Sequence, residues 1–153
     1  ARMVVPTNGN GAQQPLAPLI RMGSAAPDFE LSDLDGETVS IDSIRGRETM
    51  VLFWDPACGF CQQMIGDLRA LELEPGVPGM LVVSTGAVQT NRDLGLRSPI
   101  VLDQGFDVGR RFGASGTPSA LLIDRRGRIA STVAAGAPAV LELARSSAGS
   151  TSS

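Results

Sequence analysis

Apolar and polar positions along the chain predict strands and helices that follow one another. Two short apolar runs, residues 49–54 (TMVLFW) and 80–85 (MLVVST), have the length of strands that are buried on both faces. Between them, residues 57–73 carry apolar side chains at helical spacing. This apolar stripe consists of Cys61, Met64, Ile65, Leu68 and Leu71. The pattern therefore predicts a strand, a helix that packs on the sheet through one face, and a second strand.

Shorter segments continue the alternation on both sides. Residues 28–41 predict a hairpin that turns at Asp35 and Gly36. Beyond the second apolar run, the pattern predicts helices at 87–96, 107–113 and 137–146 and strands at 99–103, 118–124 and 128–135. The last two strands are expected to be antiparallel. Together these elements predict an α/β fold, a mixed sheet with helices on both faces.

Composition changes near both ends of the chain. Residues 1–22 are rich in Gly, Asn, Gln and Pro and predict a linker or an extended arm, whereas residues 148–153 predict a disordered polar tail. Residues 23–147 form the predicted folded domain. A chain of 153 residues is long enough for one domain with a hydrophobic core.

Charge and residue content exclude several classes of function. The formal net charge is -3, so electrostatics give no reason to expect binding to nucleic acid. No apolar run approaches the roughly 20 residues that a helix needs to cross a bilayer. No signal-peptide pattern is visible, and because the sequence begins at Ala1 without Met, removal of upstream sequence stays open. The absence of His removes the usual general base and the commonest metal ligand.

The two cysteines, Cys58 and Cys61, stand three residues apart at the start of the predicted helix. Two Cys without His make a structural zinc site within one chain unfavourable, although a metal or an iron–sulfur cluster shared between two chains stays open. A structural disulfide would close too short a loop to stabilise the fold much. A redox-active pair accounts best for the spacing and the position.

The predicted helix start gives the two sulfur atoms different roles. Cys58 follows Pro56 at the helix N-terminus, where unpaired N–H groups and the helix dipole stabilise a thiolate and lower its pKa. Cys61 lies one turn further on, at the head of the apolar stripe, and should be more buried. We therefore predict that Cys58 attacks a disulfide and that Cys61 resolves the product. The dithiol is then the redox group, and no metal or other cofactor is needed.

Two segments resemble the thioredoxin superfamily. Residues 53–61 (FWDPACGFC) resemble its active-site segment, including Trp54 four residues before the first Cys. Residues 113–124 (GASGTPSALLID) resemble the segment that carries its cis-proline, which would be Pro118 after Thr117. The resemblance implies a thioredoxin-like fold in which the cis-proline loop packs beside the sulfur atoms and its backbone pairs with the client chain.

A longer match indicates a branch of the superfamily. Residues 22–54 resemble the start of the redoxin branch, which contains TlpA-like and ResA-like thiol–disulfide oxidoreductases and the peroxiredoxins. Residues 91–112 correspond to that branch's helix–strand insertion before the cis-proline. The resemblance covers residues 23–147. It implies exchange with protein thiols and disulfides, more often as a reductant, outside the cytoplasm or tethered to a membrane. It also implies electrons from a membrane thiol transporter. We expect a monomer.

Two positions depart from the family pattern. Leu52 stands where thioredoxin has a buried Asp, and Met64 stands where ResA-like proteins have a Glu. Both usual proton-handling carboxylates are therefore missing. Asp55 is the nearest acid in sequence, and we favour a solvated loop residue. The alternative is a base for Cys61 or a like charge that raises the pKa of Cys58.

Other residues around the pair are candidates for client binding. Gly59 and Gly116 are expected to keep the approach to the sulfur atoms open, although Gly116 is also explained by turn geometry alone. For Phe60 two interpretations stay open, an exposed partner-binding side chain or one that folds back onto the helix. Thr117 and Pro118 complete the predicted client-binding set. Trp54 is expected to pack beneath the active-site helix.

Two other functions compete with dithiol exchange. A peroxiredoxin-like peroxidase is one, because the redoxin branch contains such enzymes. Peroxiredoxins place a Thr three residues before the reactive Cys, whereas this chain has Asp55, an anion that cannot donate a hydrogen bond to peroxide. The other is a redox relay or binding domain of a larger membrane system that does not turn over by itself.

Overall fold

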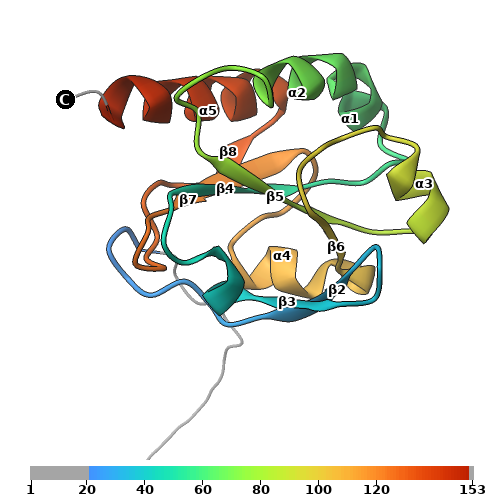
Figure 1. The fold of residues 1–153 in the computed structure, drawn as a ribbon, viewed down its shortest axis with the longest axis horizontal. Coiled ribbons are helices and arrows are strands. Elements are labelled where there is room, and N and C mark those ends of the chain that lie inside the picture. The colour runs from blue at the N-terminus through green and yellow to red at the C-terminus, as the bar shows by residue number, and fades with distance from the viewer. Residues whose placement is uncertain (1–20, 152–153) are drawn as a thin grey trace, which may run out of the picture.

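The computed structural model describes residues 21–151, which fold around one mixed sheet (Figure 1). Its strands are β2 (Glu30–Asp33), β3 (Thr38–Ser40), β4 (Thr49–Phe53), β5 (Gly79–Ser84), β6 (Ile100–Leu102), β7 (Ser119–Ile123) and β8 (Ala134–Ala135). They lie in the order β3-β2-β6-β5-β4-β7-β8. Strands β4, β5 and β6 are parallel, and the others join antiparallel. The predicted α/β fold with a mixed sheet is confirmed.

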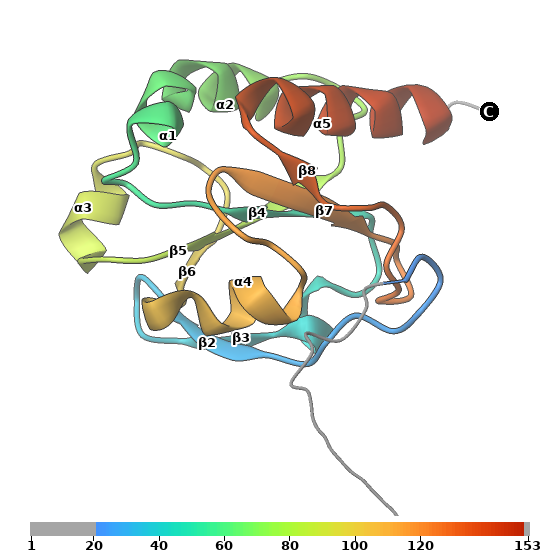
Figure 2. The same cartoon turned by 180° about the vertical axis from the view of Figure 1, so that it is seen from behind.

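Helices cover both faces of this sheet (Figures 1 and 2). They are α1 (Gly59–Gln63), α2 (Ile65–Leu71), α3 (Val88–Arg92), α4 (Asp107–Arg111) and α5 (Ala137–Thr151), with short 3-10 turns η1 (Ile41–Ile44) and η2 (Gln104–Phe106). Helices α1, α2 and α5 lie together on one face, and α4 lies on the opposite face (Figures 1 and 2). The parallel strands all end at the edge of the sheet where α1 begins.

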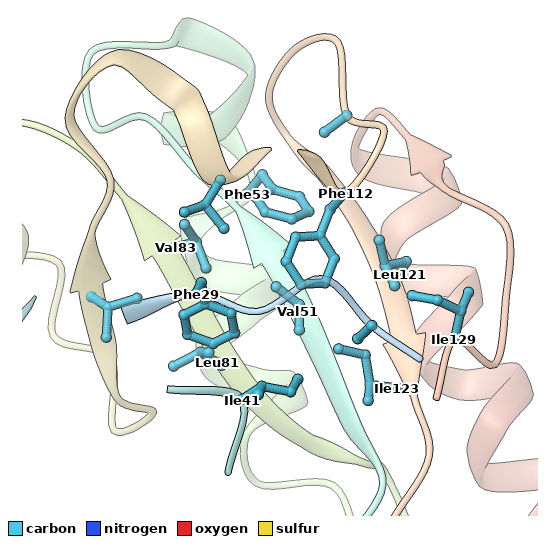
Figure 3. Packing of buried hydrophobic residues seen from close by; sticks show 14 residues of the cluster. Phe29, Ile41, Val51, Phe53, Leu81, Val83, Phe112, Leu121, Ile123 and Ile129 are labelled. Atoms are coloured by element: carbon cyan, nitrogen blue, oxygen red, sulfur yellow. The ribbon is translucent and has the colours of Figure 1, made fainter. Parts of the chain in front are cut away.

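The period of two along β4 divides the core between the faces. Val51 and Phe53 pack toward α4, where the Phe53 and Phe112 rings lie 5.8 Å apart between centroids (Figure 3). Met50 and Leu52 point the other way and pack in the cluster that includes Cys61 of α1. All five residues of β4 are buried, as the continuous apolar run predicts. The central strand is therefore packed on both faces, and the cysteine segment follows directly from its end.

The helix predicted over residues 57–73 differs from the observed one. The observed helix starts at Gly59 and is interrupted at Met64. The backbone angles of Met64, a φ of -98° and a ψ of 4°, separate α1 from α2. The apolar stripe is still buried along one side, because one non-helical residue changes the side-chain spacing too little to expose it. Hydrophobic periodicity therefore cannot reveal this break.

The strand predicted over residues 128–135 is mostly absent. Only Ala134–Ala135 forms β8, while Ile129 makes an isolated bridge with Ile123. Between these points the Ser131 hydroxyl accepts the Leu122 N–H at 2.9 Å, so a side chain takes the place of the ladder partner. This side-chain hydrogen bond replaces a backbone hydrogen bond and interrupts the strand pairing, as Ser and Thr side chains often do.

The chain ends also differ from the prediction in part. Helix α5 continues to Thr151, beyond the predicted end at residue 146, so residues 148–151 of the expected tail are helical. Residues 147–151 contain no Pro, and Gly149, their one strong helix-disfavouring residue, costs only about 1 kcal/mol, which does not by itself end a helix. Residues 152–153 and most of the predicted N-terminal arm, residues 1–20, lie outside the described residues.

Candidate active site

The cysteine segment leaves the carboxyl end of β4 through a tight turn. The backbone carbonyl of Asp55 accepts the Cys58 N–H at 2.9 Å, and its Oδ1 accepts the Ala57 N–H at 2.9 Å. Pro56 lies within this turn, and its carbonyl accepts a hydrogen bond from the Gln62 side chain at 2.8 Å. Asp followed by Pro favours such a turn, so the sequence itself places Cys58 at the start of α1.

Cys58 is the N-cap residue of α1 and is half-buried. Its Sγ accepts the Cys61 N–H at 3.4 Å, and its thiol donates to the Thr117 carbonyl at 3.5 Å. Partial burial by itself raises the pKa of Cys58. The hydrogen bonds from the Cys61 backbone and side chain, the Thr117 side chain and the Phe60 backbone outweigh burial and lower that pKa. The predicted position and the predicted direction of the shift are both found.

Cys61 lies beneath Cys58 with an exposed fraction of 0%. Burial raises the pKa of its thiol to about 12, although the backbone of Asp55 acts in the opposite direction. The thiol of Cys58 beside it raises the pKa further. Both sulfur atoms are free thiols in this structure, so the geometry is that of the reduced pair.

Pairing between β7 and β4 brings the cis-proline loop beside the cysteines. Strand β7 is antiparallel to β4 with Ser119 opposite Phe53, so the residues just before Ser119 lie beside the segment that leaves β4. The Thr117–Pro118 peptide bond is cis, as the resemblance predicted. Thr117 is half-buried and contacts Cys58 directly through its carbonyl. Two segments about 60 residues apart in the chain therefore meet at one sulfur atom.

Trp54 and Asp55 lie where the sequence placed them. Trp54 is 2% exposed and packs in the same cluster as Cys61, and its Nε1 has no hydrogen-bond partner within residues 21–151. The Asp55 carboxylate is held by the turn, and the Asp55 backbone is the part that acts on Cys61. These contacts agree with a loop residue that shapes the turn.

The residues proposed for client binding surround the sulfur pair. Phe60 is 70% exposed, so it does not fold back into the core. Gly59 and Gly116 are exposed, and a Cβ atom at either would meet no atom within 4 Å. Neither has a positive φ, so turn geometry does not require a glycine at Gly116. Both glycines therefore have open space where a side chain would stand, Gly59 next to Cys58 in the chain and Gly116 next to Thr117.

Sequence reasoning missed the start of α5 as part of this surface. Ala137 and Pro138 line a pocket together with Phe60 and Pro118. They reach it because β8 pairs with β7, and the Gly136 N–H donates to the Pro118 carbonyl at 2.8 Å. A short two-residue strand gives almost no pattern of its own, so no local signal could have predicted this neighbour.

Among residues 21–151, no cluster of three or more His, Cys, Asp or Glu side chains could hold a metal ion. Within the same residues, no helix combines the length and the apolar character needed to span a bilayer.

Comparison with known proteins agrees with this geometry. The model of the AhpC/TSA family matches residues 22–132, which is more than half of the chain. The chain belongs to the AhpC/TSA family. Among curated relatives, a thiol-disulfide oxidoreductase ResA of Geobacillus thermodenitrificans is 31% identical over 118 residues, or 72% of this chain and 67% of the relative. A second ResA, of Halalkalibacterium halodurans, is 28% identical over the same length. The predicted ResA-like membership and the class of thiol–disulfide oxidoreductase are confirmed.

Solved structures show the same fold. The thioredoxin domain of a thiol-disulfide oxidoreductase from Bacteroides vulgatus superposes with a TM-score of 0.67 at 22% identity, covering 84% of this chain and 98% of that domain. The pneumococcal exposed lipoprotein thioredoxin of Streptococcus pneumoniae gives a TM-score of 0.61 at 21% identity, covering 78% and 99%. The predicted thioredoxin-like fold is confirmed.

Proposed function

We propose that this protein reduces disulfides of protein clients through the Cys58–Cys61 pair. The Cys58 thiolate attacks one sulfur of the client disulfide, forms a mixed disulfide and displaces the other client sulfur as a thiolate. Cys61 then loses its proton and attacks Cys58, which releases the second client thiolate. The client gains two electrons, and the protein is left with a Cys58–Cys61 disulfide.

The difference between the two cysteine environments carries this proposal. Cys58 is partly accessible, and four hydrogen-bonding contributions lower its pKa, as an attacking thiolate requires. Cys61 has no exposed surface, so no client sulfur can reach it while the helix is intact. The only disulfide within reach of Cys61 is therefore the one that Cys58 forms.

The surroundings of Cys61 suggest which step is slow. Leu52 and Met64, at the two positions where relatives carry a carboxylate, are buried in the same apolar cluster as Cys61. A thiol with a pKa of about 12 provides little thiolate at neutral pH. We infer that deprotonation of Cys61 is the slow part of resolution, and that it becomes easier once Cys58 is in the mixed disulfide, because, besides burial, the Cys58 thiol also raises that pKa.

The names of the relatives support the kind of substrate and the location outside the cytoplasm, whereas the monomeric state is our own proposal. We propose that the clients are proteins, that the dithiol is the only redox group, and that the molecule works as a monomer outside the cytoplasm. One structural neighbour is itself named an exposed lipoprotein thioredoxin. A thiol donor in the membrane would then return the Cys58–Cys61 disulfide to the dithiol.

Turnover of a protein disulfide tests this proposal. Catalytic amounts of the protein should accelerate insulin reduction by dithiothreitol, and the Cys58→Ser variant should not. Hydrogen peroxide consumption, measured in parallel, should stay at the uncatalysed rate. Faster peroxide consumption than insulin reduction would favour the peroxidase, and the absence of both activities would favour a redox relay or binding domain.

A further inference from the structure

Two pockets meet at Thr117, the residue whose carbonyl contacts the Cys58 sulfur. The first pocket, of about 560 Å³, lies on the side of α1 and the start of α5. The second, of about 330 Å³, lies at the carboxyl ends of β4 and β5, on the side of η2 and α4. Thr117 lines both pockets, and its carbonyl is the group 3.5 Å from the Cys58 sulfur. The reactive sulfur therefore lies against the wall between them.

The first pocket is apolar in its accessible parts. Phe60, Met64 and Pro118 line it together with Ala137 and Pro138 at the start of α5. Gln63 and Asp67 line its rim as well, but the Asp67 carboxylate already faces a cation, because it helps Glu74 to raise the pKa of Arg145. Phe60 is one of the most exposed large apolar side chains of the described residues, so covering it with a ligand removes apolar surface from water. A bulky apolar side chain fits this volume and this lining.

The second pocket combines apolar side chains, among them Trp54, Val83 and Phe106, with two carboxylates. Asp55 and Asp103 line it, and no Arg does, in a chain without Lys or His. The ion pairs found within residues 21–151 include neither of these carboxylates.

The two carboxylates differ in how far their charge is already used. Asp103 is buried and accepts the Val108 and Gly109 N–H groups at 3.1 and 3.0 Å, so the start of α4 offsets part of its charge. Asp55 uses Oδ1 for the turn, and its Oδ2 has no donor among the described residues. Asp55 is therefore the group that can receive a cation from a ligand.

We propose that the two pockets select the client segment on either side of its reactive cysteine. They favour a bulky apolar side chain on one side and an Arg or Lys on the other. A client sulfur bound to Cys58 must lie over Thr117, so the residues before and after the client cysteine diverge into different pockets. This inference rests on the proposed exchange reaction and adds a preference for client sequence, with the chemistry unchanged.

Peptide disulfides test the charge preference. Each peptide carries one cysteine as a mixed disulfide with 2-mercaptoethanol, with Phe two residues to one side and Arg two residues to the other, in both orders. Matched peptides replace Arg by Glu or Phe by Ala. In the preferred order, reduced wild-type protein should react about three to ten times faster with the Arg peptide than with the Glu peptide. Equal rates in both orders would overturn the proposal.

Two pairs of variants locate the effect. Asp55→Asn keeps the turn, because an Asn Oδ1 accepts the same N–H, and it should reduce the Arg-to-Glu ratio to about one to two. Asp42→Asn, the same charge change at an exposed position away from both pockets, should leave the ratio unchanged. Phe60→Ser should abolish the Phe-to-Ala preference, whereas Leu73→Ser, at a residue that is 65% exposed and follows the end of α2, should not. Each preference is a ratio of two reaction rates measured with the same variant. A change in the reactivity of Cys58 alters both rates equally and therefore cancels.

A small neutral substrate separates the two proposals. Reduced protein should cleave bis(2-hydroxyethyl) disulfide, which fills neither pocket. If the protein fails to cleave it and the peptides as well, the oxidoreductase proposal fails. If it cleaves it but shows no preference among peptides, or if Asp55→Asn keeps the full Arg preference, the oxidoreductase proposal stands and the pocket proposal is wrong.

Discussion

The sulfur of Cys58 accepts the backbone N–H of Cys61 at 3.4 Å, while the thiol of Cys61 is buried beneath it with no exposed surface. One peptide N–H of the second cysteine thus stabilises the thiolate of the first. The same short helix start that lowers one pKa carries the other sulfur into the apolar core, where its pKa rises. This coupling gives two chemically identical side chains different roles.

The stability of the reduced protein should fall at alkaline pH. The folded pKa of Cys61, about 12, is raised above its unfolded value of about 8.5, so above pH 8.5 the unfolded chain has lost a proton that the folded one keeps. This contribution is complete below pH 8.5 and is lost as pH rises toward 12. The pKa of Cys58 is lowered, so Cys58 adds no slope once it has ionised in both states. Between pH 9 and 10.5 we expect a loss of about 1–2 kcal/mol in the free energy of unfolding.

Urea unfolding at several pH values measures this loss. The chain has no Lys or Tyr, so few other groups titrate in that range. The oxidised protein and the reduced Cys61→Ser variant serve as controls and should lack this slope. The same slope in all three proteins would show that the buried thiol is not its cause.

Trp54 should report the redox state. It is the only Trp, is 2% exposed, and packs in the cluster that contains Cys61, so a change at that sulfur alters its surroundings. We expect the fluorescence emission to change when the disulfide is reduced, and the change to disappear in Cys58→Ser. Identical spectra of the two redox states would contradict the placement of Trp54 beside the pair.

Asn91→Ala should destabilise the fold by about 1–3 kcal/mol. The Asn91 amide donates to the carbonyls of Thr85 and Ala87, both at 2.9 Å, and its oxygen accepts from the Ser84 hydroxyl. Its side chain is buried, so the substitution removes three hydrogen bonds and leaves a cavity in their place. The Ala87 carbonyl keeps the Asn91 N–H, and the Ser84 hydroxyl keeps only its long bond of 3.4 Å to the Thr85 carbonyl. Gln89→Ala, on the exposed side of the same helix, should change stability by less than about 0.5 kcal/mol. Thermal or urea unfolding distinguishes the two, and equal effects would contradict this account of α3.

The single-cysteine variants should differ in trapping clients. Cys61→Ser leaves the attack by Cys58 intact and removes resolution, so mixed disulfides should accumulate and appear as higher-mass species on non-reducing gels. Cys58→Ser should trap none, because the remaining thiol is buried. Equal trapping by both variants would mean that Cys61 reaches clients directly.

The continuous apolar runs were sufficient to predict the centre of the sheet. Strands β4 and β5 are buried from both faces, so nearly every side chain in them is apolar and the pattern is unambiguous. The spacing of the cysteines and Pro56 also predicted the start of α1 to within two residues. These features depend only on local sequence.

Features that depend on distant contacts could not be predicted from pattern. The kink at Met64 preserves the apolar stripe, and the Ser131 hydroxyl that replaces a ladder bond is visible only once Leu122 lies opposite. The second pocket forms where the ends of β4, β5 and the loop before β7 meet, and its acidic character needs Asp55 and Asp103 together. The cis bond before Pro118 was predicted from resemblance alone.

Relative alkylation of the two cysteines tests the central claim most directly. The reduced protein is treated with a limiting amount of iodoacetamide at pH 6, quenched at intervals, and each cysteine is quantified by mass spectrometry of its peptide. A thiol must ionise and be reachable to react, so Cys58 should be labelled well before Cys61. Labelling of Cys61 first, or of both cysteines at the same rate, would contradict the assignment of Cys58 as the attacking thiolate.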